Sequence, residues 1–257
     1  MSNYSPRRQL PFVRIGPAIL SALTVLGLAV VLAGPLHGQQ EEIKSPYRWI
    51  ERDTRLGLFG GYYLANRGNL EHGVGSTPLA GLRFRYRVSS PLSLEASVGY
   101  GPSDRWVIDP RLETGPAPVD TVAAHWILIT AGVQAGLTGA RTWHGIHPYL
   151  MLGGGIQIGV KNEISDYENF EDPQDTALRY QLGTSPMVYA GLGAEVFPSS
   201  RFGIGFEVRD DIIRLKSPDG WFTLEVLQAI EESGGEAPKE SQWTHNFEFT
   251  LNLWYYF

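Results

Sequence analysis

The last eleven residues of the chain, 247–257, alternate strictly in polarity, and this restricts the folds that the chain can adopt. The apolar set is Phe247, Phe249, Leu251, Leu253, Tyr255 and Phe257, and Glu248, Thr250 and Asn252 lie between them. A period of two predicts a β-strand. A soluble protein seldom leaves such an aromatic strand at a sheet edge, because it would template aggregation. A strand that closes a barrel inside a membrane has no free edge and turns its apolar side chains toward lipid.

Seven earlier segments show the same alternation. They are residues 55–66, 81–89, 92–101, 125–137, 148–160, 185–197 and 201–213. Each is long enough to cross a bilayer when tilted. The connections after the second, fourth and sixth segments are short or moderate, and the others are longer, as in outer-membrane barrels. The predicted fold class is therefore all-β, an up-and-down antiparallel eight-stranded transmembrane β-barrel.

The glycines distinguish this prediction from a soluble lipocalin-type barrel, which could also have eight strands. Many strand glycines fall on the same face as the charged residues, among them Gly57, Gly99, Gly153, Gly193 and Gly205. Small residues beside large charged ones suit a narrow, filled lumen, whereas a water-facing exterior has no need of them.

The charges on this face nearly cancel. Arginines Arg55, Arg83, Arg85, Arg87 and Arg209 share it with Glu95, Glu195, Glu207, Asp211 and Glu248. Since an unpaired charge in a dry lumen is costly, the balance predicts a buried network. An eight-stranded barrel is just wide enough for side chains to fill, so we expect a closed or very narrow lumen.

The N-terminal segment predicts export. Arg7, Arg8 and Arg14 precede a continuous apolar stretch at 18–33, and Gly34-Pro35 ends it. We interpret residues 1–38 as a signal peptide, 39–54 as a periplasmic lead-in and 55–257 as the barrel. A retained transmembrane anchor is the alternative interpretation of 18–33.

Composition excludes several function classes. The chain has no cysteine, which rules out disulfides, thiolate catalysis and cysteine-based zinc sites. A net charge of -6 does not provide the basic surface that nucleic acid requires. Acidic loops at 161–182 and 217–241 suit either cation or lipopolysaccharide interaction, or simple solubility. Within the second loop, Ser217-Pro218 and the following residues predict a capped helix.

Residues 55–257 resemble the small outer-membrane β-barrels of the OmpA-like and OmpW-like families. The resemblance rests on the export segment, the eight alternating segments and the terminal strand residues Phe249, Leu251, Leu253, Tyr255 and Phe257. It implies location in the outer membrane, contact with lipid and lipopolysaccharide, and insertion by the barrel-assembly machinery, which reads that terminal strand. The resemblance does not extend to the C-terminal peptidoglycan-binding domain of full-length OmpA, so we do not expect anchoring to the cell wall.

No residues specify an enzyme, a cofactor or a metal site. His245 could act with Glu248 or Asp211 in a lipid-modifying triad, but no serine nucleophile accompanies it. His144 and His147 lack further metal ligands nearby. The leading hypothesis is a non-enzymatic barrel with a structural or surface-interaction role. A small-solute channel of the OmpW type is the alternative, and a lipid-modifying barrel enzyme is the third.

Overall fold

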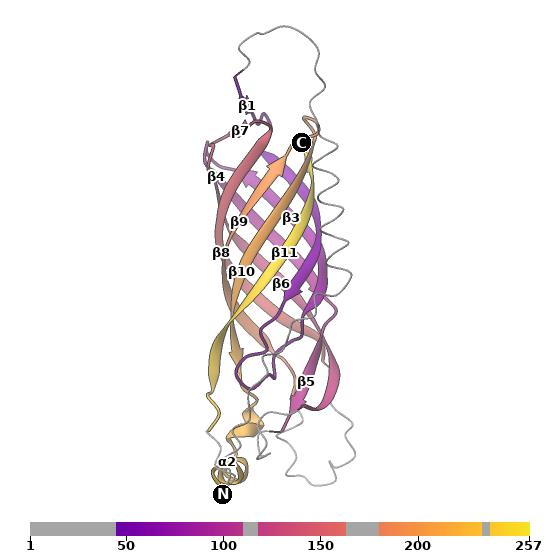
Figure 1. Cartoon of the computed structure of the whole chain (residues 1–257), viewed down its shortest axis with the longest axis vertical. Helices are drawn as coiled ribbons and strands as arrows, with labels where there is room; N and C mark the ends of the chain where they lie inside the picture. Colours follow the sequence, from indigo (N-terminus) through magenta and orange to yellow (C-terminus); the bar gives the residue numbers. More distant parts are fainter. Residues whose placement is uncertain (1–44, 110–117, 163–179, 233–236) are drawn as a thin grey trace, which may run out of the picture. The chain divides into compact units, whose positions relative to one another are not determined.

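The computed structural model describes residues 45–109, 118–162, 180–232 and 237–257, and most of them form one closed antiparallel barrel (Figure 1). Eight long strands make its wall. They are β2 (Thr54–Leu64), β3 (Thr77–Arg87), β4 (Leu92–Gly101), β6 (Pro118–Gly136), β8 (Ile146–Asn162), β9 (Thr184–Val196), β10 (Phe202–Lys216) and β11 (Ser241–Tyr256). The predicted fold class is thus confirmed.

The wall closes where the last strand pairs with the first long one. β11 runs antiparallel to β2, with Phe247 opposite Leu64 and Tyr256 opposite Arg55. Each remaining strand pairs with its sequence neighbour in the ring, and β6 pairs with β8. The terminal strand therefore has hydrogen-bonded partners on both sides, β10 and β2. Closure removes the aggregation-prone edge that the sequence would otherwise leave exposed.

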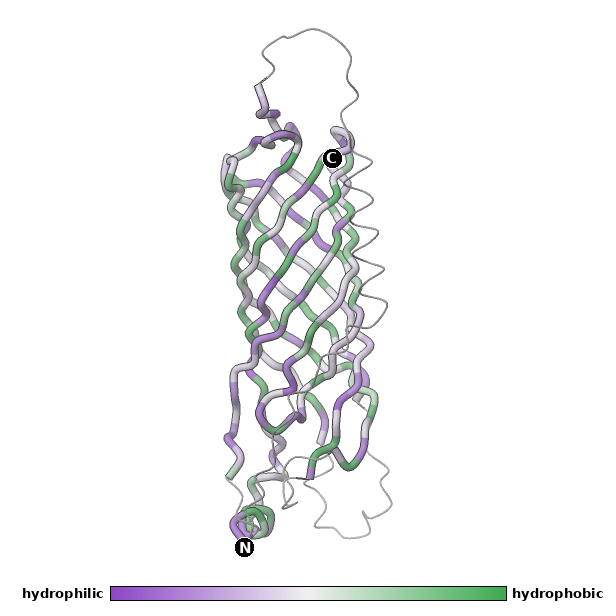
Figure 2. The backbone as a smooth tube through the Cα atoms, viewed as in Figure 1, coloured by the Kyte–Doolittle hydropathy of each residue, from purple (hydrophilic) through white to green (hydrophobic). Residues whose placement is uncertain are grey.

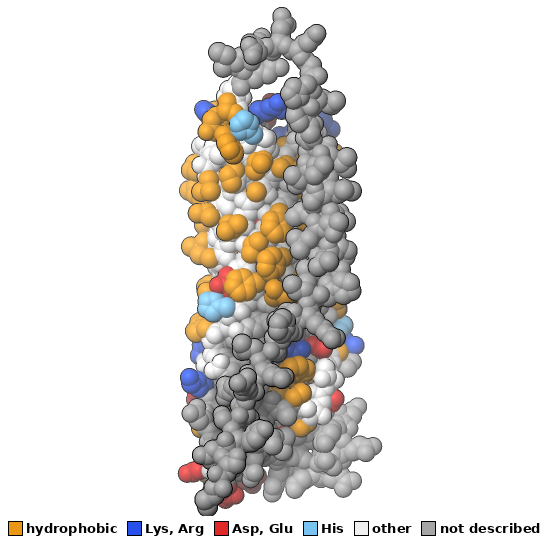
Figure 3. Space-filling model, viewed as in Figure 1, with side chains coloured by type: hydrophobic (Ala, Val, Ile, Leu, Met, Phe, Trp, Pro, Cys, Tyr) orange, Lys and Arg blue, Asp and Glu red, His pale blue; other side chains and the backbone are white. Residues whose placement is uncertain are grey.

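The wall is apolar outside and polar inside. Leucine, valine, isoleucine and aromatic side chains with exposures between 36% and 62% cover the outer surface of the strands, while the buried set contains arginines, glutamates, asparagines and threonines. The hydropathy therefore alternates along each strand (Figure 2). Hydrophobic side chains cover the middle of the face in view, and many of the charged ones lie toward its ends (Figure 3).

The apolar exterior is tall enough to cross a membrane. Along β11 and the residue after it, the apolar exterior extends from Phe247 to Phe257. On β10 it extends from Phe202 to Val208, and Asp210 follows. At roughly 3.3 Å per residue and a strand tilt of about 40°, the β11 stretch spans roughly 25 Å, the usual height of the lipid-facing band.

Smaller elements occupy the two ends of the wall. At the end that holds the C-terminus, β1 (Tyr47–Trp49) pairs with β7 (Arg141–Trp143). At the opposite end lie β5 (Asp104–Ile108), the short 3₁₀ helix η2 (Asp219–Phe222) and α2 (Leu224–Glu232). Among the described residues, no helix has the length and apolarity to span a bilayer. We call the C-terminal end periplasmic and the other end outer, because short turns face the periplasm in such barrels.

Several strands are longer than the sequence predicted. β6 begins seven residues before the predicted 125, β11 begins six before 247, and β3 begins four before 81. The predicted helix after Ser217 is present, but it starts as η2 and continues as α2 after a break at Thr223. The Ser217 hydroxyl donates to the Lys239 carbonyl at 2.6 Å instead of capping it. The signal-peptide prediction and most of the first acidic loop lie outside the described residues.

Candidate functional site

The centre of the lumen holds a network of charged side chains around Glu207. This carboxylate accepts hydrogen bonds from Arg85 Nη2 at 2.7 Å, from Arg209 Nη2 at 3.1 Å and from the Tyr149 hydroxyl at 2.6 Å. Arg83 Nη1 also donates to it. Glu207 and these three arginines are at most 1% exposed. Glu207 comes from β10, whose inward-facing positions alternate with lipid-facing ones, so the strand period itself aims this carboxylate at the axis.

Two further carboxylates complete this part of the network. Glu95 accepts from Arg85 Nε at 2.7 Å and also from Arg209, and Glu248 accepts from Arg83 Nη2 at 3.2 Å. The arginines additionally lie over aromatic rings, with Arg85 4.4 Å from the centre of the Trp254 ring. Each guanidinium is thus matched by at least one buried carboxylate, which is the condition for keeping charge in a dry interior.

A second cluster lies nearer the periplasmic end. Arg55 donates to Glu195 at 2.7 Å and to Gln134 Oε1 at 3.0 Å, and the Tyr256 hydroxyl joins both Arg55 and Glu195. Glu195 has no exposed surface. Because Tyr256 is the last residue of β11, this cluster fixes the periplasmic end of that strand to the lumen.

Arg87 and Asp211 form no ion pair with the other described members of the predicted lumen network. Arg87, on the same strand face as Arg83 and Arg85, lies at the periplasmic opening, where Nε donates to Asp53 at 2.7 Å and Nη2 to the Ile50 carbonyl at 2.6 Å. It thus fastens the lead-in rather than the lumen. Asp211 is buried inside the barrel, but it forms no ion pair with the described residues.

His245 faces outward, away from the lumen carboxylates. Its Nδ1 lies 2.8 Å from Asp210 Oδ2 on the neighbouring strand, and both side chains are partly exposed. Glu248 points inward, so the triad considered from the sequence is split between the two faces of the wall. His144 and His147 also fail to converge on a metal site, since the described residues contain no group of three potential ligands.

Close packing inside the lumen depends on glycine. A Cβ atom at Gly193 would lie 2.6 Å from the Tyr149 ring, and one at Gly57 would lie 2.6 Å from the Trp254 ring. These large rings therefore lie directly against the wall. Aromatic rings above glycines, together with the ion pairs, fill the cross-section.

The outer end carries a packed structure that sequence reasoning missed. Its apolar centre contains Ile108, Tyr180, Trp221, Val226 and Ile230, which come from β5, the segment before β9, η2 and α2. We call this structure the outer cap. Trp221 has no exposed surface, and the Tyr180 hydroxyl donates to the Trp106 carbonyl at 3.0 Å. The alternating-polarity pattern identifies strands only, and these residues lie in loops, so that pattern does not reveal the cap.

His72 is buried inside the outer cap. It lies between the rings of Tyr180 and Trp221, at centroid distances of 6.4 and 5.1 Å, and its Nε2 is 3.3 Å from the Lys216 carbonyl. Burial lowers the pKa of His72 from 6.5 to about 4, because the charged ring would lose its hydration. The Lys216 carbonyl opposes this shift, and the positive charge of Arg105 adds to it.

The cap should therefore weaken in mild acid. When it opens, His72 recovers its ordinary pKa of 6.5, so the open state binds a proton that the closed state rejects. The free energy needed to open the cap should be highest above pH 6.5. It should fall by roughly 3 kcal/mol as the pH drops to about 4. Hydrogen exchange of α2, corrected for intrinsic rates, measures this fall.

A pair of histidine variants controls that experiment. His72→Gln should remove most of the pH dependence of α2 exchange, whereas His125→Gln, at the barrel rim, should leave it intact. An unchanged pH dependence in His72→Gln would show that other groups are responsible.

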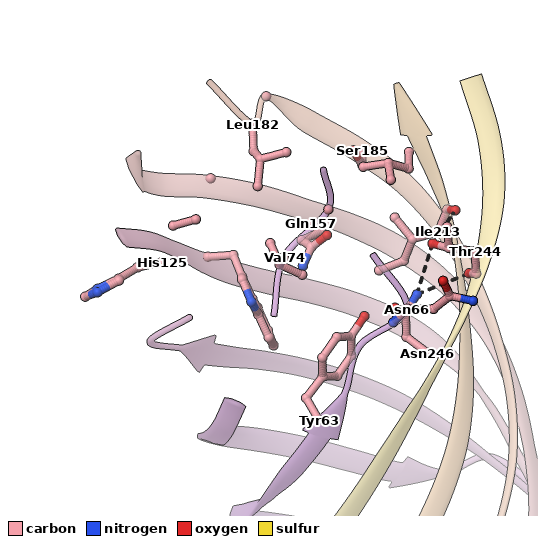
Figure 4. Close-up of a pocket in the computed structure, with 16 residues that line it drawn as sticks. Tyr63, Asn66, Val74, His125, Gln157, Leu182, Ser185, Ile213, Thr244 and Asn246 are labelled. Atoms are coloured by element: carbon pink, nitrogen blue, oxygen red, sulfur yellow. Dashed lines mark hydrogen bonds between the residues drawn. The ribbon is translucent and has the colours of Figure 1, made fainter. Parts of the chain in front are cut away.

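A small chamber lies at the outer end of the lumen. Its lining includes Tyr63, Val74, Trp126, Gln157 and Asn246 (Figure 4). Its volume is about 20 Å³ for water-sized molecules. Roughly 10–15 Å³ is enough for one water, so the chamber suits water and small ions.

The arrangement as a whole fixes the environment of the wall. Strands with an apolar exterior about as tall as a bilayer, around a charged interior, are stable only with lipid outside. Closed barrels with this polarity are the β-proteins of outer membranes. This protein is an outer-membrane β-barrel.

Comparison with known proteins agrees with this fold. No protein-family model and no curated protein sequence matches the barrel. Similar solved structures include OprG from Pseudomonas aeruginosa, with 10% identity, a TM-score of 0.46, and coverage of 80% of this chain and 98% of that chain. Neisserial surface protein A has 11% identity, a TM-score of 0.46, and coverage of 83% and 98%. Outer membrane protein W from E. coli has 17% identity, a TM-score of 0.41, and coverage of 80% of this chain and 99% of that chain. Because these identities and TM-scores are low, the fold assignment rests on the strand register of the barrel itself.

Proposed function

We propose that the barrel is a non-conducting envelope protein with a structural or surface-interaction role, which displays the outer cap on a rigid, filled support. The burial of the lumen network carries this proposal. Arg83, Arg85, Arg209, Tyr149 and Trp254 all have exposures below 2%, although their side chains lie in the barrel lumen. Side chains lining a continuous water-filled path would be accessible to water.

The lumen should therefore block ions. In planar bilayers the purified wild-type barrel should give no stepwise conductance at neutral pH, because four buried guanidinium groups and their carboxylates would have to separate for an ion to pass. Arg214→Ala, on the exposed exterior, should be equally silent. Steady wild-type conductance would contradict the proposal.

A small-solute channel is the second candidate, and one observation favours it. Hollows reach into both ends of the barrel, the outer one to Tyr63 and the periplasmic one to Arg55 and Tyr256. The filled section between them is thus the obstruction. If Arg85→Ala conducts while the wild type is silent, the network is a removable gate. If both are silent, the channel candidate is excluded.

We also propose the partners that the resemblance implies. Phe249, Leu251, Leu253, Tyr255 and Phe257 all face the exterior, with exposures of 36–56%. This position supports both contact with membrane lipid and lipopolysaccharide and reading of the strand by an assembly machinery before closure. Replacing Phe257 with alanine and measuring the yield of folded barrel in the membrane fraction tests the second of these.

A further inference from the structure

The described lumen contains one more carboxylate than guanidinium groups. The buried arginines are Arg55, Arg83, Arg85 and Arg209, and the buried acids are Glu95, Glu195, Glu207, Asp211 and Glu248. Every one of these glutamates forms an ion pair with an arginine, and Asp211 forms none within the described residues. Since an ionised carboxylate in a dry interior is unstable without compensation, Asp211 requires a positive charge from outside the network, either a cation or a proton.

Asp211 is a buried carboxylate without a bonded partner in the described part of the chain. Asp211 is 1% exposed, and neither of its carboxylate oxygens has a hydrogen-bond partner among the described residues. Glu248 is its strongest charged neighbour, while Arg209 and Arg83 act on it without forming an ion pair. Carboxylates and other hard oxygens are the ligands that hard cations prefer.

Tyr63 provides a second, independent observation. It has no exposed surface, its hydroxyl has no partner among the described residues, and Asp211 and Glu248 both interact with it electrostatically. Tyr63 lies opposite Glu248 in the strand register and lines the chamber below the cap (Figure 4). The Tyr63 hydroxyl is therefore a third buried oxygen atom beside Glu248, and it also reaches the chamber.

The chamber gives access of the right size. It is lined by Asn246, which pairs with Asp211 across β10 and β11, and by Ile213, the next inward residue after Asp211 on β10. Its volume of about 20 Å³ admits a water molecule or a bare small ion. An organic cation such as choline is too large for it.

We propose that Asp211, with the Glu248 carboxylate and the Tyr63 hydroxyl, binds one small monovalent cation at the outer end of the lumen. One positive charge restores the balance of the network. A divalent ion would overcompensate it, and Glu248 already accepts a hydrogen bond from Arg83 at 3.2 Å. The cation completes the outermost layer of the filled lumen.

Thermal unfolding in two salts tests this site. The barrel is refolded in zwitterionic detergent, and its unfolding midpoint is measured in sodium chloride and in choline chloride at equal ionic strength. Saturating sodium should raise the wild-type midpoint by on the order of 5 °C. Asp211→Asn should abolish the difference, because the neutral amide needs no counter-ion. Asp210→Asn is the matched control, since Asp210 is the adjacent residue but faces outward to His245, and it should keep the full difference.

Three other results would contradict a cation at Asp211. Equal wild-type midpoints in sodium and choline would overturn the proposal, even if Asp211→Asn fails to fold. An infrared band of a protonated carboxyl group that is present in the wild type at neutral pH in sodium chloride and absent from Asp211→Asn would also overturn it, because Asp211 would then hold a proton. A sodium effect that persists in Asp211→Asn would place the cation elsewhere.

Discussion

Replacing Glu207 with glutamine should lower the free energy of unfolding by about 3–5 kcal/mol, the usual effect of removing one partner from a buried ion pair. Glu207 accepts from three arginines and from Tyr149, and none of these side chains can reach water in the folded barrel. The glutamine keeps the shape of the side chain but leaves the arginines short of one negative charge. Equilibrium unfolding by urea in lipid vesicles measures the loss.

Asp210→Asn again serves as the control. Asp210 is on the same strand, but it forms a partly exposed pair with His245 on the exterior, so its loss should cost about 0–1 kcal/mol. If Glu207→Gln unfolds at the wild-type urea concentration, the lumen network does not stabilise the barrel.

Gly61→Ile should prevent the barrel from closing. A Cβ atom at Gly61 would lie 1.9 Å from the backbone oxygen of Phe249 on β11. Because this neighbour is backbone and not a flexible side chain, the two strands that close the ring would have to separate. We expect almost no compact, heat-modifiable species on a gel run without boiling, and a large loss of folded protein from the membrane fraction.

The neighbouring residue gives a matched control. A Cβ atom at Gly60 would meet nothing nearer than the Leu79 oxygen at 3.8 Å, an ordinary contact. Gly60→Ile adds the same side chain one residue away and should still give the heat-modifiable barrel. Equal folding of the two variants would show that β2 and β11 are not held as closely as described.

The sequence predicted the wall well because the two faces of each strand differ so strongly inside a membrane. The predicted 92–101 strand matches β4 residue for residue. The prediction was short for β6 and β11, whose outer extensions rise beyond the lipid. There, water replaces lipid, so polar residues such as Thr121 and Ser241 can face outward and interrupt the apolar alternation.

The alternation along each strand predicted which charged residues face the lumen, but it could not predict which of them pair with one another. Arg83, Arg85 and Arg87 are equivalent by alternation, yet Arg87 lies where β3 ends and binds Asp53. Asp211 lacks an arginine because of its position along the axis, and that depends on strand register rather than on composition. The outer cap was unpredictable for a further reason. Its contacts, such as His72 with Trp221, join segments nearly 150 residues apart that have no periodic pattern.

The outer extensions of the strands set the distance between the lipid-facing band and the outer cap. On β10 the unbroken run of outward-facing apolar residues ends at Val208, and the strand continues from Asp210 to Lys216 before the cap begins. Six further residues of tilted strand amount to roughly 15 Å along the membrane normal. The extended strands therefore hold the cap outside the hydrocarbon core, at the level of the lipid headgroups and sugars or beyond. A partner approaching from outside would meet the cap before it could touch the lipid-facing wall.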